Sequence, residues 1–132
     1  MPRIFTYHVS SLVSVHDGDT CTVIVDLGFD LSREVDIRVN GIDTPEMTGE
    51  SRAAAIIARD AAVAWIKSRI DHLILLSKEL DKYGRVLGDL QDTIDGSKLS
   101  EYMVTKKLAH TYSGGTRLPW STAEYLAIRA IK

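Results

Sequence analysis

The first third of the chain alternates apolar and polar residues at the period of a β-strand. Segment 4–15 is rich in β-branched and aromatic residues, which favours a strand. Every second residue from Cys21 to Val25 is apolar, and segment 34–40 alternates in the same way. This pattern predicts three consecutive strands joined by short turns.

The period changes after residue 50. In segment 50–70, Ile56 and Val63 belong to a set of apolar residues that recurs at helical spacing among many alanines. This spacing predicts an amphipathic helix of several turns. Segments 72–77 and 85–90 return to the strand pattern and predict a second hairpin.

Two further helices are expected near the C-terminus. Ser97 is a candidate cap for a helix that runs to about Leu108, and Ser121 with Glu124 forms the pattern of a capping box. The order is βββ-α-ββ-α-α. It predicts an α+β, mainly β domain built on a five-stranded barrel of the OB type with three helices.

Composition indicates one folded domain over residues 1–132. The chain is 45% hydrophobic and 26% charged, and no Pro-, Gly- or Ser-rich linker divides it. The net charge is −2, but residues 1–66 hold 5 basic and 10 acidic side chains, and residues 67–132 hold 11 and 8. The acidic half is either a solvated surface or a set of carboxylates gathered around a cation.

The single cysteine, Cys21, excludes an internal disulfide. No apolar run reaches the ~18 residues that a membrane helix needs, and the first residues lack the apolar stretch of a signal peptide. We therefore expect a cytoplasmic protein with no membrane contact and no obligate protein partner, or a secreted protein if an export signal once preceded it.

Two acidic motifs flank the second and third predicted strands. D-G-D-T at 17–20 is by itself typical of a turn. Asp19 in this motif and Asp43 in the second are equally far from the expected hairpin turn near Leu31. In an antiparallel ladder such residues lie side by side. When two carboxylates lie this close, either the pKa of one of them is raised or the two share a Ca²⁺ or Mg²⁺ ion. The Thr44 carbonyl could point toward the same ion. If the register slips, each carboxylate faces water instead.

Two arginines complete the candidate chemistry. Strand parity places Arg38 on the face opposite Asp43, unless Gly41 permits a bend. The turn D-K-Y-G-R at 81–85 carries Arg85, which would form a pair suited to phosphate oxygens if it points toward Arg38. Carboxylates, a cation and two arginines are the groups that phosphodiester cleavage requires.

The three motifs D-G-D-T, R-x-x-x-x-D-T-P-E and D-K-Y-G-R resemble those of the staphylococcal nuclease (thermonuclease) family, from about Val13 to Tyr112. This resemblance implies a Ca²⁺-dependent phosphodiesterase that acts on DNA and RNA, single-stranded or frayed, with little sequence specificity. It also implies cleavage of the bond to the 5′ oxygen, which leaves 3′-phosphate ends.

The resemblance also implies a role for each matching residue. Asp19, Asp43 and the Thr44 carbonyl would hold Ca²⁺. Glu46 would act as general base or position the water. Arg38 and Arg85 would bind the scissile phosphate. The residues that would contact neighbouring phosphates or bases are Lys82, Tyr83 and Tyr112.

The chain departs from the family pattern at two places. Only Met47, Thr48 and Gly49 separate Glu46 from the predicted helix, where the family has a long loop, and the family's second tyrosine near Tyr112 has no clear counterpart. Two alternatives therefore stay open. One is a catalytically inactive OB domain that binds nucleic acid or a protein partner, and the other is a phosphodiesterase for a small nucleotide. Because every implied catalytic and metal-binding residue is present, the sequence favours the nuclease.

Overall fold

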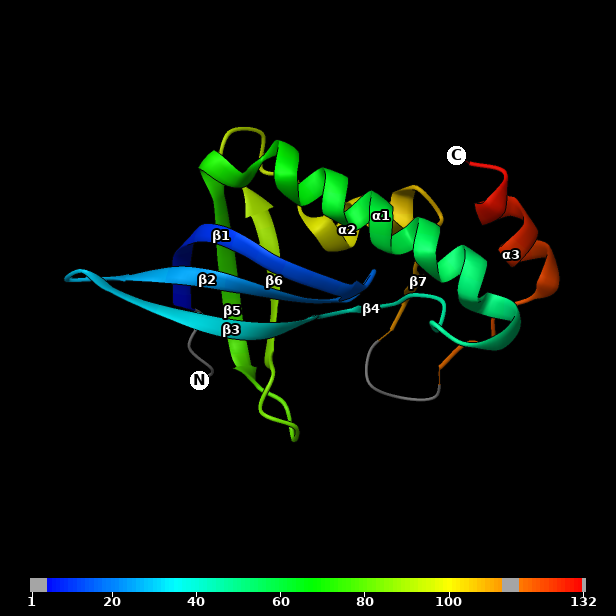
Figure 1. The fold of residues 1–132 in the computed structure, drawn as a ribbon, viewed down its shortest axis with the longest axis horizontal. Helices are drawn as coiled ribbons and strands as arrows, with labels where there is room; N and C mark the ends of the chain where they lie inside the picture. The colour runs from blue at the N-terminus through cyan, green and yellow to red at the C-terminus, as the bar shows by residue number, and fades with distance from the viewer. Residues whose placement is uncertain (1–4, 113–116, 132) are drawn as a thin grey trace.

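A computed structural model describes residues 5–112 and 117–131. Five strands close into a barrel in the order β1-β2-β3-β6-β5 (Figure 1). They are β1 (Phe5–Asp17), β2 (Thr20–Gly28), β3 (Leu31–Val39), β5 (Leu73–Leu80) and β6 (Val86–Asp92). The neighbours are antiparallel except β3 and β6, which run parallel. The predicted five-stranded OB-type barrel is therefore confirmed.

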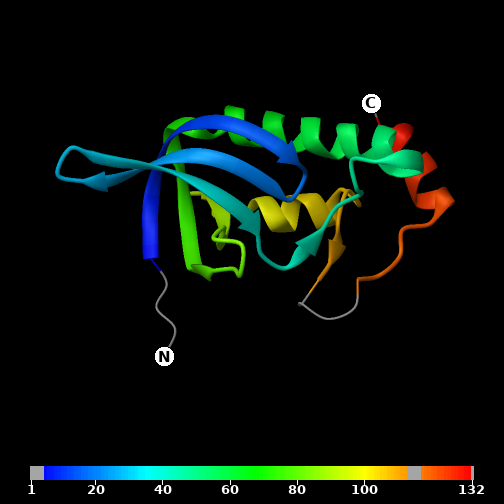
Figure 2. The same cartoon turned by 60° about the horizontal axis from the view of Figure 1, so that its bottom comes forward.

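The helices cover one side of the barrel. They are α1 (Arg52–Ser68), α2 (Leu99–Thr105) and α3 (Thr122–Arg129), with short 3₁₀ turns η1 (Gly49–Ser51) and η2 (Ile70–His72) at the two ends of α1. Figure 2 shows α1 lying along the barrel, with α2 beneath it and α3 at the far end. Among the described residues, no helix is long and apolar enough to cross a membrane.

The buried face of α1 agrees only in part with the predicted apolar set, of which Ile66 is buried. Ile56 and Val63 are half-buried, and the face turned to the core carries mostly small residues. These buried residues are Ala54, Ala55, Ala58, Ala62, Trp65 and Ile66. Alanine has a short side chain, so the helix can lie close to the strands. Of the larger apolar residues, Trp65 and Ile66 are buried, while Ile56 and Val63 border the contact.

One of the two predicted helix caps is present and the other is not. Ser121 accepts from the Glu124 amide and the Glu124 side chain accepts from the Ser121 amide, so the predicted capping box is present. The predicted cap at Ser97 is wrong, because Lys98 occupies that position and the Ser97 hydroxyl donates to Asp95 at 2.7 Å instead. Helix α2 also ends at Thr105, before the predicted Leu108.

A second, two-stranded sheet was not predicted. It joins β4 (Ile42–Asp43) to β7 (His110–Thr111) in antiparallel fashion, with Asp43 opposite His110. Each strand has only two residues, too few to show a period in the sequence. This small sheet holds the chain beyond β3 beside the segment that leads to α3 (Figure 1).

Candidate functional site

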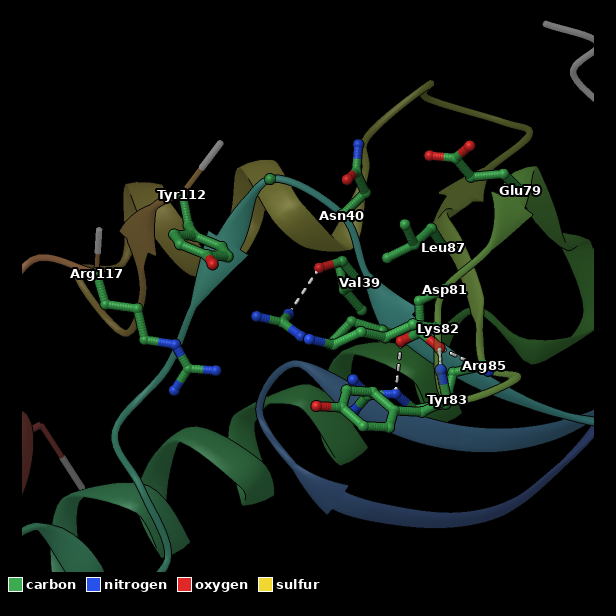
Figure 3. A pocket seen from close by; sticks show the side chains of 12 residues that line it. Val39, Asn40, Glu79, Asp81, Lys82, Tyr83, Arg85, Leu87, Tyr112 and Arg117 are labelled. Carbon is green, nitrogen blue, oxygen red and sulfur yellow. Dashed lines mark hydrogen bonds and ion pairs between the residues drawn. The ribbon is translucent and has the colours of Figure 1, made fainter. Parts of the chain in front are cut away.

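A groove of about 490 Å³ lies where β3, the β5–β6 turn and the segment after β7 meet. Figure 3 shows Tyr112 and Arg117 on one side of it and Lys82, Tyr83 and Arg85 on the other. Twelve residues line the groove: Arg38, Val39, Asn40, Gly41, Glu79, Asp81, Lys82, Tyr83, Arg85, Leu87, Tyr112 and Arg117. Four of them are cationic and two are acidic, so a groove on an acidic protein has a basic lining.

Asp19 and Asp43 meet beside this groove, but not by the predicted ladder pairing. The ladder pairs Thr20 with Arg38, and the amide of Val39 donates to the Asp19 carbonyl at 2.8 Å. The chain then turns at Gly41, whose φ of 86° suits glycine, and β4 brings Asp43 back toward Asp19. The predicted proximity holds, whereas the predicted register is wrong.

The Asp19 carboxylate is held by several donors. The Thr44 amide donates to its Oδ2 at 3.0 Å, and the Thr20 hydroxyl donates to its Oδ1 at 3.1 Å. Burial pushes the pKa of Asp19 upward, but a hydrogen bond with Asp17, the charge of Arg38 and these donors outweigh burial and hold that pKa below its usual value. Asp19 is therefore a buried anion at neutral pH.

Neighbouring Asp17 shows the opposite behaviour. Burial and the adjacent Asp19 carboxylate raise the pKa of Asp17 to about 7. Asp43 is buried as well, and burial raises the pKa of Asp43, with Arg117 acting against this and Asp19 adding to it. The Asp19 carboxylate thus disfavours a second negative charge on either of its two acidic neighbours.

Arg38 points toward the carboxylates. Its Nη1 lies 3.4 Å from Asp19 Oδ2 and donates to the Val39 carbonyl at 2.9 Å, while Nη2 donates to the Ile42 carbonyl at 2.9 Å. The side chain is buried. The bend at Gly41 is present and wraps the chain around the guanidinium, so strand parity does not hold Arg38 away from Asp43.

Arg85 takes its orientation from its own turn. Its Nε donates to Asp81 Oδ2 at 2.8 Å, and Asp81 Oδ1 accepts from the amides of Tyr83 and Arg85 at 2.9 Å. The guanidinium also lies 5.4 Å from the centre of the Tyr83 ring, and Lys82 Nζ lies 5.2 Å from the same ring. Arg85 and Arg38 line one groove, but Arg85 is braced by Asp81 and not by direct pairing with Arg38.

Glu46 is exposed, unlike Asp19, Asp43 and Thr44. Its side chain is 72% exposed, although its backbone is fixed because the Ser51 hydroxyl donates to the Glu46 carbonyl at 2.5 Å. Its Oε1 lies 3.5 Å from Nη1 of Arg117. The short connection to α1 therefore holds the backbone and leaves the carboxylate accessible.

Arg117 belongs to the site although it was not predicted from the sequence. Its Nη1 lies 3.6 Å from Asp43 Oδ1, and its guanidinium lies 5.8 Å from the centre of the Tyr112 ring. Nearby Trp120 stacks on His110 with 3.8 Å between ring centres, which holds this segment against β7. Arg117 belongs to no periodic pattern, so only its packing in three dimensions identifies it.

The donors at this corner suit a hard divalent cation. Asp19 and Asp43 supply buried carboxylates, and Thr44 Oγ1 is a buried oxygen with no hydrogen-bond partner among the described residues. Ca²⁺ and Mg²⁺ prefer such oxygen ligands. Within residues 5–112 and 117–131, no three His, Cys, Asp or Glu side chains are grouped to hold a metal. A cation here would therefore take its remaining ligands from backbone carbonyls, water or substrate.

Comparison with known proteins identifies the family. The family model described as staphylococcal nuclease homologue matches residues 36–128, which include every candidate residue except Asp19. Asp19 lies outside the match, and its place at the site rests on its contacts with Arg38 and Thr44. A search of curated proteins found no match. The match covers more than half of the sequence and agrees with the barrel and its three helices, so the chain belongs to the staphylococcal nuclease homologue family.

Proposed function

We propose that the protein is a Ca²⁺-dependent phosphodiesterase that hydrolyses DNA and RNA with little sequence specificity and leaves 3′-phosphate ends. The observation that carries this proposal is the position of the basic groove directly beside the carboxylate corner. Arg38 links them, because it lines the groove and lies 3.4 Å from Asp19. A phosphodiester in the groove would therefore lie next to the oxygen donors.

The groove suits a polynucleotide better than a folded protein partner. Arg38, Lys82, Arg85 and Arg117 supply positive charge for phosphates, and Tyr83 and Tyr112 supply aromatic faces. Aromatic side chains stack on any base, so such a groove has little preference for sequence. Because both tyrosines need unpaired bases, single-stranded or frayed substrates are the expected partners.

Ca²⁺ held by Asp19, Asp43 and the Thr44 carbonyl would polarise a phosphoryl oxygen and offset its charge. Glu46, exposed and free to reach solvent, accepts the proton of the attacking water. Arg85 and Arg38 donate to the oxygens on which negative charge develops, and each is already held by its neighbours, so little reorganisation is needed.

The bond changes balance in one displacement. Glu46 takes one proton from the water, the water oxygen bonds to phosphorus, and the bond from phosphorus to the 5′ oxygen breaks. The 5′ oxygen then takes a proton from solvent to become a hydroxyl, and Glu46 releases its proton to solvent. The products are a 3′-phosphate and a 5′-hydroxyl end.

Glu46→Gln tests this assignment. A general base contributes ~10²–10⁴-fold, so we expect the cleavage rate of a single-stranded oligonucleotide at saturating Ca²⁺ to fall by about 100-fold or more. Glu34→Gln is the matched control, since Glu34 is an exposed residue of β3 outside the groove. Equal rates for Glu46→Gln and Glu34→Gln would refute the role of Glu46. A dinucleotide cleaved as fast as the oligonucleotide would instead favour a phosphodiesterase for small nucleotides.

A further inference from the structure

Arg117 bridges two carboxylates of the proposed catalytic site. Its Nη1 lies 3.6 Å from Asp43 Oδ1 and 3.5 Å from Glu46 Oε1. One nitrogen is thus shared between two acids, and neither contact is short or bidentate. The Arg117 side chain is also 53% exposed. The guanidinium is therefore placed to neutralise both carboxylates, but it is held weakly.

Charge explains why the guanidinium stays there. Asp43 is buried and close to Asp19, whose own charge is balanced by Arg38 at 3.4 Å. Arg117 is the cation that balances Asp43, and the Asp43 carboxylate is the main cause that raises the pKa of Arg117. Each of the two aspartates thus has one arginine.

The two arginines differ in how firmly they are held. Arg38 is buried and donates to two backbone carbonyls, so it cannot leave without a loss of hydrogen bonds. Arg117 makes no such backbone contact within the described part of the chain. It lies 5.8 Å from the Tyr112 ring and lines the groove, so a small rotation would keep it near an aromatic face.

We propose that Arg117 competes with the divalent cation for Asp43, and so sets the cation concentration at which the site fills. The inference rests on the proposed function, because Asp43 is a cation ligand only under that proposal. A divalent cation bound to Asp43 would lie within a few ångströms of the guanidinium, and like charges at that distance repel. The arginine therefore moves away when the cation binds, and its lost ion pairs weaken cation binding.

Calorimetric titration of Ca²⁺ into the full chain, without substrate, tests the competition. Because exposed ion pairs are weak, we expect Arg117→Gln to bind Ca²⁺ about three- to tenfold more tightly than the wild type. Arg117→Lys keeps the charge and should stay near the wild-type affinity. Arg129→Gln is the control for net charge, since Arg129 is exposed on α3 and forms no ion pair with Asp43 or Glu46 within the described residues, and it should leave the affinity unchanged.

An affinity of Arg117→Gln equal to or weaker than that of the wild type would overturn the inference, as would equal tightening by Arg129→Gln. Absence of Ca²⁺ binding in all four proteins would also overturn it, together with the metal requirement of the proposed function. The two proposals remain separable. Ca²⁺-dependent cleavage with unchanged affinity in Arg117→Gln refutes only the competition, whereas tighter binding in a protein that cleaves nothing refutes only the nuclease.

Discussion

Loss of the Arg38 side chain should destabilise the whole domain as well as impair cleavage. Arg38 and Asp19 are both buried, with 3.4 Å between Nη1 and Oδ2. At an effective dielectric constant of ~20, two unit charges at this distance attract by about 5 kcal/mol, and removal of one partner from a buried pair costs about 3–5 kcal/mol. Arg38→Gln also weakens the hydrogen bonds to Val39 and Ile42, at about 1 kcal/mol each.

We therefore expect Arg38→Gln to lower the free energy of unfolding by about 3–5 kcal/mol, a large part of the stability of a domain this size. Urea denaturation followed by the fluorescence of the buried Trp65 measures it. The control is Arg33→Gln, an exposed arginine of the same strand, which should change stability by about 0.5 kcal/mol or less.

A double-mutant cycle separates the ion pair from the other contacts. Asp19→Asn in the Arg38→Gln background should cost much less than it does in the wild type, because the buried anion no longer has a partner to lose. Equal stability of Arg38→Gln and Arg33→Gln, or costs that simply add in the cycle, would show that the buried ion pair does not stabilise the domain.

Three further predictions concern the surroundings of the site and the core. In Gly18→Ala the new Cβ would stand 2.8 Å from Thr44 Cγ2 and 2.9 Å from Met103 Cε. We therefore expect urea denaturation to show a free energy of unfolding lower by about 1–3 kcal/mol, and calorimetry to show weaker Ca²⁺ binding. If neither value changed, the close packing around Gly18 would be contradicted. Burial raises the pKa of the Cys21 thiol to about 12, so a disulfide reagent should label it only on unfolding, and fast labelling of the native protein would show that the barrel opens. Burial also raises the pKa of Asp89 in the folded protein. Above that pKa the buried, ionised carboxylate lowers the stability of the fold, and this loss disappears as the pH falls below it and the carboxylate takes up a proton. Asp89→Asn should then be more stable than the wild type at pH 7, with an advantage that shrinks on acidification; a constant difference in urea midpoints would argue against it.

Local sequence patterns were enough to predict the barrel. The alternation around Val23 and Ile37 reflects one face of a strand turned to the core, and both residues are fully buried. The buried face of α1 was predicted only at Ile66, because apolar periodicity emphasises large side chains and most of the buried residues of the helix are alanines.

The site was predicted where motifs mark it and missed where only tertiary structure forms it. Asp19 and Asp43 lie close together because of the turn at Gly41, which the assumed straight hairpin did not include. Arg117 reaches Asp43 because the segment before α3 is fixed by packing of Trp120 on His110. No residue spacing in the sequence predicts the contact between Arg117 and Asp43.

Digestion of single-stranded DNA by the wild type and by Asp43→Asn, with Ca²⁺ or with EDTA, followed by analysis of the product ends, tests the proposed nuclease and its metal site together. Asp60→Asn is the matched control, since Asp60 is an exposed carboxylate of α1. We expect 3′-phosphate products from the wild type and Asp60→Asn in Ca²⁺, none in EDTA, and almost none from Asp43→Asn. Equal cleavage in EDTA, equal cleavage by Asp43→Asn, or no cleavage by the wild type in Ca²⁺ would contradict the proposed function.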